Sequence, residues 1–315
     1  MMKTALLFSG QGAQCVGMGR DLATHFPSAA VWFDRANETL GYDLRTLCFE
    51  GPEAELTKTE HAQPGIFLTS WAAFQLLRQE APDLSFQATA GLSLGEFTAL
   101  AAADVFDFDT ALRLVRQRGQ FMQRACEETE GSMAAIIGLN EAETQSVCDE
   151  CGVDLANLNC PGQLVISGEK SGVARACELA KQRGAKKALP LAVAGAYHSR
   201  LMASARTRLE SLLAVTPVNS PALPVISNVT ATPHTTPDDI RARLTAQVTA
   251  PVRWEDSIRA LIADGFDRFI ELGPGTVLGG FTKRIDKAVA SMNIADAASL
   301  KTTLEKLAMP RTDLT

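Results

Sequence analysis

The chain has 315 residues, 46% of them hydrophobic and 21% charged, an ordinary globular composition that excludes a disordered chain, a fibre and a coiled coil. At about 150 residues per domain, this length predicts two domains. The formal net charge of -6 disfavours a general surface for nucleic acid or for an anionic membrane.

Seven cysteines are an odd number in so long a chain, and they do not indicate a disulfide framework. Free thiols fit a reducing compartment, so we expect a cytoplasmic protein. The apolar runs all fall short of the roughly 18 residues that a membrane-spanning helix needs, so we expect no membrane span. The short apolar run at 3–8 is typical of a buried strand rather than of a signal peptide.

Strand-like and helix-like segments alternate along the chain, which predicts an α/β protein with a parallel sheet. The first half is expected to hold strands at 3–8 and 86–92 and helices at 64–79, 95–103 and 107–127. The last third is expected to hold a helix at 199–214, strands at 223–228 and 266–272, and a fraying tail from Met309.

The middle of the chain follows a different order of elements. Strands are expected at 132–139, 153–159, 164–168 and 187–193, with helices at 141–150 and 171–183. This β-α-β-β-α-β order is the ferredoxin-like pattern. We therefore expect a small ferredoxin-like subdomain at 128–197, inserted into a large α/β domain made of 1–127 and 198–315.

The sharpest local motif is the G-x-S-x-G pentapeptide at 91–95, which follows a predicted strand and opens a predicted helix. This is the context of a nucleophile elbow, in which a tight strand-to-helix turn exposes the serine hydroxyl at a helix N-terminus. Ser93 is therefore the candidate nucleophile. The elbow also predicts that the large domain has an α/β-hydrolase-like core.

A serine nucleophile needs a general base, and the chain offers four histidines: His25, His61, His198 and His234. His198 is the best placed, because it lies in a loop at the predicted domain junction. No aspartate or glutamate between Ser93 and His198 stands out as a third member of a triad. A neutral acceptor, including a backbone carbonyl, can orient the imidazole equally well, so a dyad is as plausible as a triad.

A second glycine-rich loop lies at 9–14, directly after the first predicted strand. It lacks the Gly-Lys-Ser/Thr of a phosphate-binding P-loop, and Cys15 stands where a dinucleotide-binding motif has its last glycine. A better use for this loop is to bring a backbone N–H close to a reacting oxygen, as one donor of an oxyanion hole.

Seven short motifs together resemble those of malonyl-CoA:acyl-carrier-protein transacylases. They are Gly10-Gln11-Gly12-Ala13-Gln14, Gly91-Leu92-Ser93-Leu94-Gly95-Glu96, Gln117-Arg118-Gly119, the stretch 157–163, His198-Ser199-Arg200-Leu201-Met202, the stretch 247–254 and Glu271-Leu272-Gly273-Pro274-Gly275. Each motif is weak alone, but seven in the family's order are specific. The length is similar to that of the stand-alone bacterial enzymes of fatty-acid synthesis.

The resemblance implies a role for each matching residue. Ser93 would be the nucleophile, His198 the base, and the backbone N–H groups of Gln11 and Leu94 the oxyanion hole. Arg118 would pair with the free carboxylate of the malonyl group, a task that suits a planar guanidinium. The backbone carbonyl of Gln247 would orient His198. These are the site residues that we expect.

The implied activity is malonyl transfer from malonyl-CoA to the phosphopantetheine thiol of acyl carrier protein, through a malonyl-serine intermediate. It requires no cofactor and no metal, and we expect a monomer. Three alternatives stay open: a serine hydrolase or thioesterase on the same elbow, a transacylase subunit of a malonate-processing complex, and a non-catalytic carrier-binding subunit. One departure from the family is Leu92, which stands where a histidine is frequent.

Two further motifs carry less weight. Cys148 and Cys151 form a lone C-x-x-C pair with no histidine nearby, so they do not predict a zinc site. The basic run at 181–187 is a solvated surface in most proteins, although it could dock an acidic carrier protein.

Overall fold

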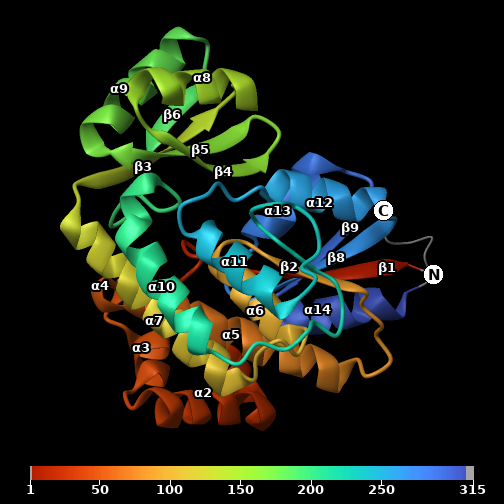
Figure 1. Ribbon diagram of the computed structural model, residues 1–315. Helices are drawn as coiled ribbons and strands as arrows, with labels where there is room; N and C mark the ends of the chain where they lie inside the picture. The colour runs from red at the N-terminus through yellow and green to blue at the C-terminus, as the bar shows by residue number, and fades with distance from the viewer. Residues whose placement is uncertain (1, 310–315) are drawn as a thin grey trace.

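The computed structural model describes residues 2–309 and contains two separate sheets (Figure 1). The larger sheet has five parallel strands in the order β7-β2-β1-β8-β9. Its strands are β1 (Lys3–Phe8), β2 (Ala88–Gly91), β7 (Val225–Ile226), β8 (Phe266–Leu272) and β9 (Ala290–Ile294). From Thr4 to Phe8 the central strand β1 is fully buried, as expected for a parallel strand covered on both faces.

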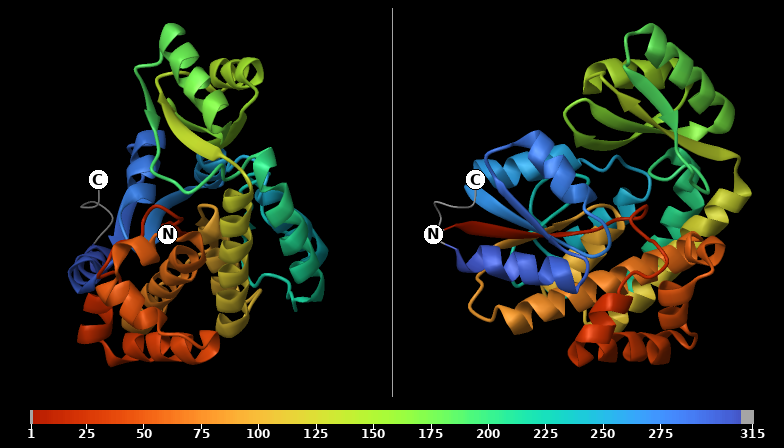
Figure 2. Two further views of the ribbon diagram at one scale, coloured as in Figure 1. Left: turned by 90° about the vertical axis from the view of Figure 1, so that its left-hand side faces the viewer. Right: turned by 180° about the vertical axis from the view of Figure 1, so that it is seen from behind.

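Helices surround this parallel sheet (Figure 2). From the first half of the chain these are α1 (Arg20–His25), α2 (Pro27–Leu40), α3 (Leu44–Glu50), α4 (Glu53–Leu56), α5 (Thr59–Glu80), α6 (Leu94–Ala102) and α7 (Phe108–Glu128). From the last third these are α10 (Ala203–Val215), α11 (Pro237–Gln247), α12 (Trp254–Ala263), α13 (Val277–Ile285) and α14 (Ala297–Ala308). The apolar stripe of α5 packs an aromatic cluster under the sheet, in which Phe74 meets Phe8 edge to face at 6.0 Å.

The smaller sheet is antiparallel, has the order β4-β5-β3-β6, and lies at the top of Figure 1. Its elements in chain order are β3 (Gly131–Ile137), α8 (Glu141–Cys151), β4 (Asp154–Cys160), β5 (Gln163–Glu169), α9 (Lys170–Gln182) and β6 (Lys187–Pro190). These elements bury an apolar cluster of their own, centred on residues such as Ile136, Val147 and Ile166. A capping box formed by Asn140 and Glu143 begins α8.

The small sheet contacts the large unit at the segment that follows α11. Val252 donates its backbone N–H to the carbonyl oxygen of Ala156 at 2.8 Å, and Leu158 donates to the carbonyl oxygen of Val252 at 2.9 Å. Strand β4 of the small sheet is thereby fixed against a loop of the large unit. The return from β6 ends in the same region, where a 3₁₀ turn (Arg200–Met202) leads into α10.

The mixed α/β class and the parallel sheet were correctly predicted, as was the order of elements in the middle of the chain. Several predicted strands are shorter in the structure: the strand at 86–92 is Ala88–Gly91, the strand at 187–193 ends at Pro190, and the strand at 223–228 is only Val225–Ile226. The helix predicted at 199–214 begins as a 3₁₀ turn. A proline explains one of these differences, because Pro224 cannot donate a hydrogen bond to the neighbouring strand β2. Most of the tail predicted to fray lies outside the described residues.

Candidate active site

Ser93 lies in the tight turn between β2 and α6. Its backbone has φ 54° and ψ -101°, a conformation that is costly for a residue with a side chain. The flanking glycines are sterically required: a Cβ at Gly91 would lie 1.9 Å from the carbonyl carbon of Gly95, and one at Gly95 would lie 2.1 Å from the carbonyl oxygen of Phe8. The glycines therefore let the chain turn sharply enough to present the serine hydroxyl at the end of the sheet.

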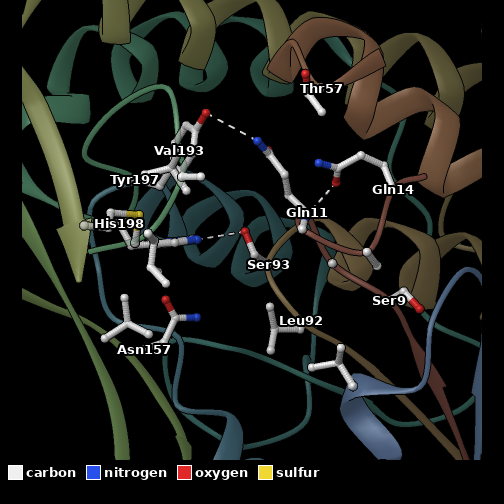
Figure 3. A pocket seen from close by; sticks show the side chains of 18 of the residues that line it. Ser9, Gln11, Gln14, Thr57, Leu92, Ser93, Asn157, Val193, Tyr197 and His198 are labelled. Atoms are coloured by element: carbon white, nitrogen blue, oxygen red, sulfur yellow. Dashed lines mark hydrogen bonds between the residues drawn. The ribbon is translucent and has the colours of Figure 1, made fainter. Parts of the chain in front are cut away.

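His198 contacts Ser93 directly. Nε2 of His198 lies 2.8 Å from Oγ of Ser93 (Figure 3). Nδ1 of His198 lies 2.8 Å from the backbone carbonyl oxygen of Gln247. A carbonyl oxygen only accepts, so Nδ1 carries the ring proton and Nε2 accepts the hydrogen bond from the serine hydroxyl. This is the tautomer that a general base for Ser93 requires.

Two features of its surroundings keep His198 uncharged. Its side chain is buried, and the cationic Arg118 lies nearby, and together these lower the pKa of His198 from 6.5 to about 4. The hydrogen bond to Gln247 opposes this shift but does not outweigh burial. At neutral pH the imidazole is therefore ready to accept a proton.

Arg118 lies on α7 and is 1% exposed. Its Nη1 donates to Oε1 of Gln63 at 2.7 Å, and its Nη2 donates to Oε1 of Gln247 at 2.9 Å and to Oγ of Ser93 at 3.1 Å. All three acceptors belong to uncharged side chains. Burial lowers the pKa of Arg118 to about 10, so the group stays charged at neutral pH. A buried cation without an anionic contact is suited to bind a carboxylate.

The two expected oxyanion-hole donors flank the elbow. Gln11 lies in the loop after β1, and Leu94 is the first residue of α6. In the part of the chain that the structure describes, neither backbone N–H has a hydrogen-bond acceptor. Unpaired N–H groups at a helix start and in a glycine-rich loop can stabilise a negative charge that forms next to Ser93.

A cavity of about 490 Å³ opens in front of Ser93 and His198. The large unit contributes the 9–14 loop, the elbow and α13, and the small sheet contributes residues from β3, β4 and β5. The segment at 191–194 lines another side. Figure 3 shows Gln11, Ser93 and His198 reaching into this common space. Leu92, the departure from the family motif, is also part of its lining.

Sequence reasoning missed several polar residues at this site. Asn228 accepts a hydrogen bond from the backbone N–H of Ser93 at 2.6 Å and donates to the carbonyl oxygen of Gly91 at 2.8 Å. Gln63 is fully buried on α5, but Thr59, Thr69 and Ser70 of the same helix are buried as well, so its residue type alone gave no signal in the sequence. Asn228 follows a strand of the parallel sheet, which is where ligand-binding residues gather in such folds.

The other histidines lie away from the cavity. His25 is exposed and pairs with Asp21, whereas His234 is buried and contacts Glu96. His234 is therefore buried although the sequence around it is polar, because its ring packs under α11.

Among residues 2–309 no group of three or more metal-ligating side chains occurs, and Cys148 and Cys151 are free thiols. None of the described helices combines the length and apolarity that crossing a membrane requires.

The comparisons with known proteins agree with this geometry. Residues 5–306 match the family model of the acyl transferase domain, so the fold and site define an acyltransferase. The chain is 44% identical to the malonyl CoA-acyl carrier protein transacylase of Bacillus subtilis, over 98% of both chains. It is 41% identical to the enzyme of that name from Escherichia coli K12, over 97% of this chain and 100% of that one.

Solved structures give the same result. An acyl carrier protein S-malonyltransferase from Vibrio cholerae superposes with a TM-score of 0.92 at 41% identity, covering 96% of this chain and 99% of that one. A malonyl-transacylase in complex with a type II PKS acyl-carrier protein superposes with a TM-score of 0.93 at 41% identity, with the same coverage. The chain belongs to the malonyl-CoA:acyl-carrier-protein transacylase family.

Proposed function

We propose that this chain is an S-malonyltransferase that moves the malonyl group from malonyl-CoA to the phosphopantetheine thiol of acyl carrier protein, for fatty-acid synthesis. The observation that carries this proposal is a buried guanidinium, that of Arg118, 3.1 Å from the hydroxyl oxygen of a serine paired with a histidine. A dyad alone fits any acyl-serine chemistry. The adjacent buried cation selects an acyl group that ends in a carboxylate.

The first half-reaction acylates Ser93. His198 takes the hydroxyl proton at Nε2 as Oγ attacks the thioester carbonyl carbon, and the backbone N–H groups of Gln11 and Leu94 stabilise the oxyanion. The carbon–sulfur bond then breaks, His198 returns the proton to the departing CoA sulfur, and a malonyl ester of Ser93 remains. The carbonyl oxygen of Gln247 stabilises the transient imidazolium through the Nδ1 proton.

The second half-reaction reverses these steps with a new thiol. His198 removes the proton of the phosphopantetheine thiol, whose sulfur attacks the ester, and Ser93 recovers its proton as the ester bond breaks. Arg118 holds the malonyl carboxylate in both halves. It thereby keeps the ester in one pose and disfavours attack by water.

We propose the following organisation for this enzyme. An α/β-hydrolase-like catalytic domain spans 1–127 and 198–315, and a ferredoxin-like subdomain spans 128–197. The antiparallel order β4-β5-β3-β6, with α8 and α9 in the chain order β-α-β-β-α-β, supports the second assignment. The protein acts as a cytoplasmic monomer without cofactor or metal, since acyl transfer between thioesters needs only a nucleophile, a base and oxyanion donors.

The test is to incubate the protein with labelled malonyl-CoA and no acceptor, and then to add acyl carrier protein that carries phosphopantetheine. The proposal predicts a stable malonyl adduct on Ser93 that moves to the carrier thiol. Rapid release of free malonate would identify a hydrolase instead, and no adduct would exclude both activities. Ser93→Ala is the control that must remain unlabelled.

A further inference from the structure

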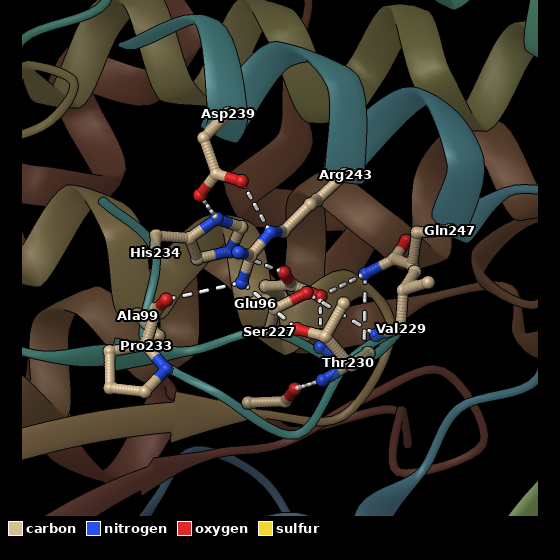
Figure 4. A network of polar contacts seen from close by, with 12 residues as sticks. Glu96, Ala99, Ser227, Val229, Thr230, Pro233, His234, Asp239, Arg243 and Gln247 are labelled. Carbon is tan, nitrogen blue, oxygen red and sulfur yellow. Dashed lines mark hydrogen bonds and ion pairs between the residues drawn. The ribbon is translucent and has the colours of Figure 1, made fainter. Parts of the chain in front are cut away.

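Glu96 is a buried carboxylate next to the site that the chemistry above does not use. It lies on α6, three residues after Ser93, and it is 0% exposed. Its Oε2 accepts hydrogen bonds from Nε2 of Gln247 at 2.6 Å and from the backbone N–H of Asn228 at 3.1 Å. Its Oε1 accepts from Nε2 of His234 at 2.7 Å (Figure 4).

The side-chain amide of Gln247 lies between this carboxylate and the guanidinium of Arg118. Its nitrogen donates to Glu96 and also to the carbonyl oxygen of Ser93 at 2.9 Å, while its oxygen accepts from Nη2 of Arg118. A carboxylate only accepts hydrogen bonds and a guanidinium only donates them. Only one of the two flip orientations of the amide therefore satisfies both neighbours.

We propose that Glu96 is a positioning residue for malonyl recognition: its charge fixes the direction of the Gln247 amide, which in turn holds Arg118 in place for the substrate carboxylate. This inference rests on the proposed function. It assigns a task to the last residue of the serine motif, which otherwise has no role in the chemistry.

The arrangement also explains how Arg118 stays charged and yet available. Within residues 2–309, the hydrogen-bond acceptors of its guanidinium are all neutral oxygens. The negative charge of Glu96 still favours the protonated form of Arg118 across the intervening amide, and it raises the pKa against the effect of burial. A direct ion pair would have occupied the guanidinium fork and competed with the substrate.

The far side of Glu96 is held by a network that does not reach the substrate. His234 donates to Oε1 of Glu96, and its Nδ1 lies 3.8 Å from Oδ2 of Asp239 on α11. Arg243 pairs with the other oxygen of Asp239 at 2.6 Å. This network contains a second carboxylate, and removing its charge leaves the contacts of Gln247 intact.

The test compares Glu96→Gln with Asp239→Asn, which removes an equal charge from the outer end of the network. In Glu96→Gln, the oxygen of the new side-chain amide accepts the hydrogen bond from His234, so its NH₂ group faces two other donors, the NH₂ group of Gln247 and the N–H of Asn228. Because two donors repel each other, we expect the Gln247 amide to flip. Its NH₂ group would then face the donors of Arg118. Acylation of Ser93 is measured in single turnovers with malonyl-CoA and with acetyl-CoA, and with phenylmethanesulfonyl fluoride, which has no carboxylate.

The expected result for Glu96→Gln is a loss of about tenfold to a hundredfold in malonyl-CoA acylation, mainly as a raised half-saturating concentration. Acetyl-CoA and sulfonyl fluoride rates should stay within about threefold, and Asp239→Asn should keep the wild-type ratio of malonyl to acetyl rates. An equal fall with all three reagents, or an unchanged ratio, overturns the proposal.

Glu96→Asp is the second variant, for use if Glu96→Gln does not fold. It keeps the charge but shortens the side chain, so the ratio of malonyl to acetyl rates should fall by a smaller factor. A wild-type ratio in a folded Glu96→Asp protein overturns the proposal. Failure of the wild-type protein to form any malonyl-Ser93 would instead refute the proposed function, so the two failures are distinguishable.

Discussion

The guanidinium of Arg118 donates a hydrogen bond to the hydroxyl oxygen of Ser93 at 3.1 Å, deep in a site where both side chains are buried. A cation at this distance from a nucleophile serves two purposes. It stabilises the negative charge that develops on the serine oxygen during attack. It also places a guanidinium beside the acyl group that will form on that oxygen.

Replacing Arg118 should therefore change which acyl group is transferred. In Arg118→Ala, we expect malonyl transfer to fall by about a hundredfold, because two charge-assisted hydrogen bonds to the carboxylate are lost. Acetyl transfer should fall far less. Steady-state rates with both CoA esters measure this preference, and Arg116→Ala on the same helix is the control. An unchanged preference for malonyl over acetyl would show that the assigned role is wrong.

The reactivity of Ser93 should persist to unusually low pH. His198 can act as a base only when neutral, and its pKa is lowered to about 4, so activity should be lost as the pH falls through about 4. The rate at which phenylmethanesulfonyl fluoride inactivates the protein measures this loss at low pH, because the reagent itself does not titrate. The rate should be flat between pH 5.5 and 7. A midpoint near 6.5 in protein that is still folded by circular dichroism would contradict the account.

The same shift affects stability. Burial lowers the pKa of His198 on folding, so the unfolded chain binds the proton more tightly than the folded chain does. The contribution of the neutral imidazole is fully present above pH 6.5 and is lost as the pH falls toward 4. Urea denaturation at pH 7 and pH 5 should show a smaller pH dependence in His198→Gln than in the wild-type protein.

Asn228→Ala should destabilise the elbow. The side chain holds the N–H of Ser93 and the carbonyl oxygen of Gly91, and both backbone groups are buried. Leaving them unpaired should lower the free energy of unfolding by about 2–4 kcal/mol. Urea denaturation gives this value, with Asn219→Ala as an exposed control that should cost less than about 0.5 kcal/mol. Equal values for the two variants would refute the role of Asn228.

Glycine at the elbow should be irreplaceable even by alanine. A methyl group at Gly91 would overlap the backbone of Gly95, so Gly91→Ala should cost about 3 kcal/mol or more, or prevent folding. Gly280→Ala is the matched control, because it lies in α13 with open space around it. That change should be neutral or stabilise the protein by up to about 1 kcal/mol, since alanine favours the helix. Soluble yield and urea denaturation distinguish these outcomes.

Much of the fold could be predicted from sequence because its signals are local. The G-x-S-x-G turn needs only five residues to be recognised, and the alternation of elements in the middle of the chain predicts the order that forms the small sheet. The first four helices were not predicted. Helices α1, α3 and α4 have six, seven and four residues, too few for an apolar stripe to repeat. Helix α2 has 14 residues and was missed although it buries an apolar face.

The outer part of the site could not be predicted in this way, because its contacts join distant positions. Glu96 and His234 are 138 residues apart, and Ser93 and Asn228 are 135 apart. Nothing in the spacing of these residues indicates that they meet. Only the folded chain, which brings the loop after β7 against the start of α6, places them together.

The most direct test of the central claim is a competition for Ser93. The protein is mixed with equal amounts of malonyl-CoA and acetyl-CoA, and the mass of the peptide that contains Ser93 is measured before and after carrier protein is added. The account predicts that malonyl is the dominant adduct on Ser93, and that it disappears as malonyl appears on the carrier thiol. An equal mixture of adducts, or label on another residue, would contradict it.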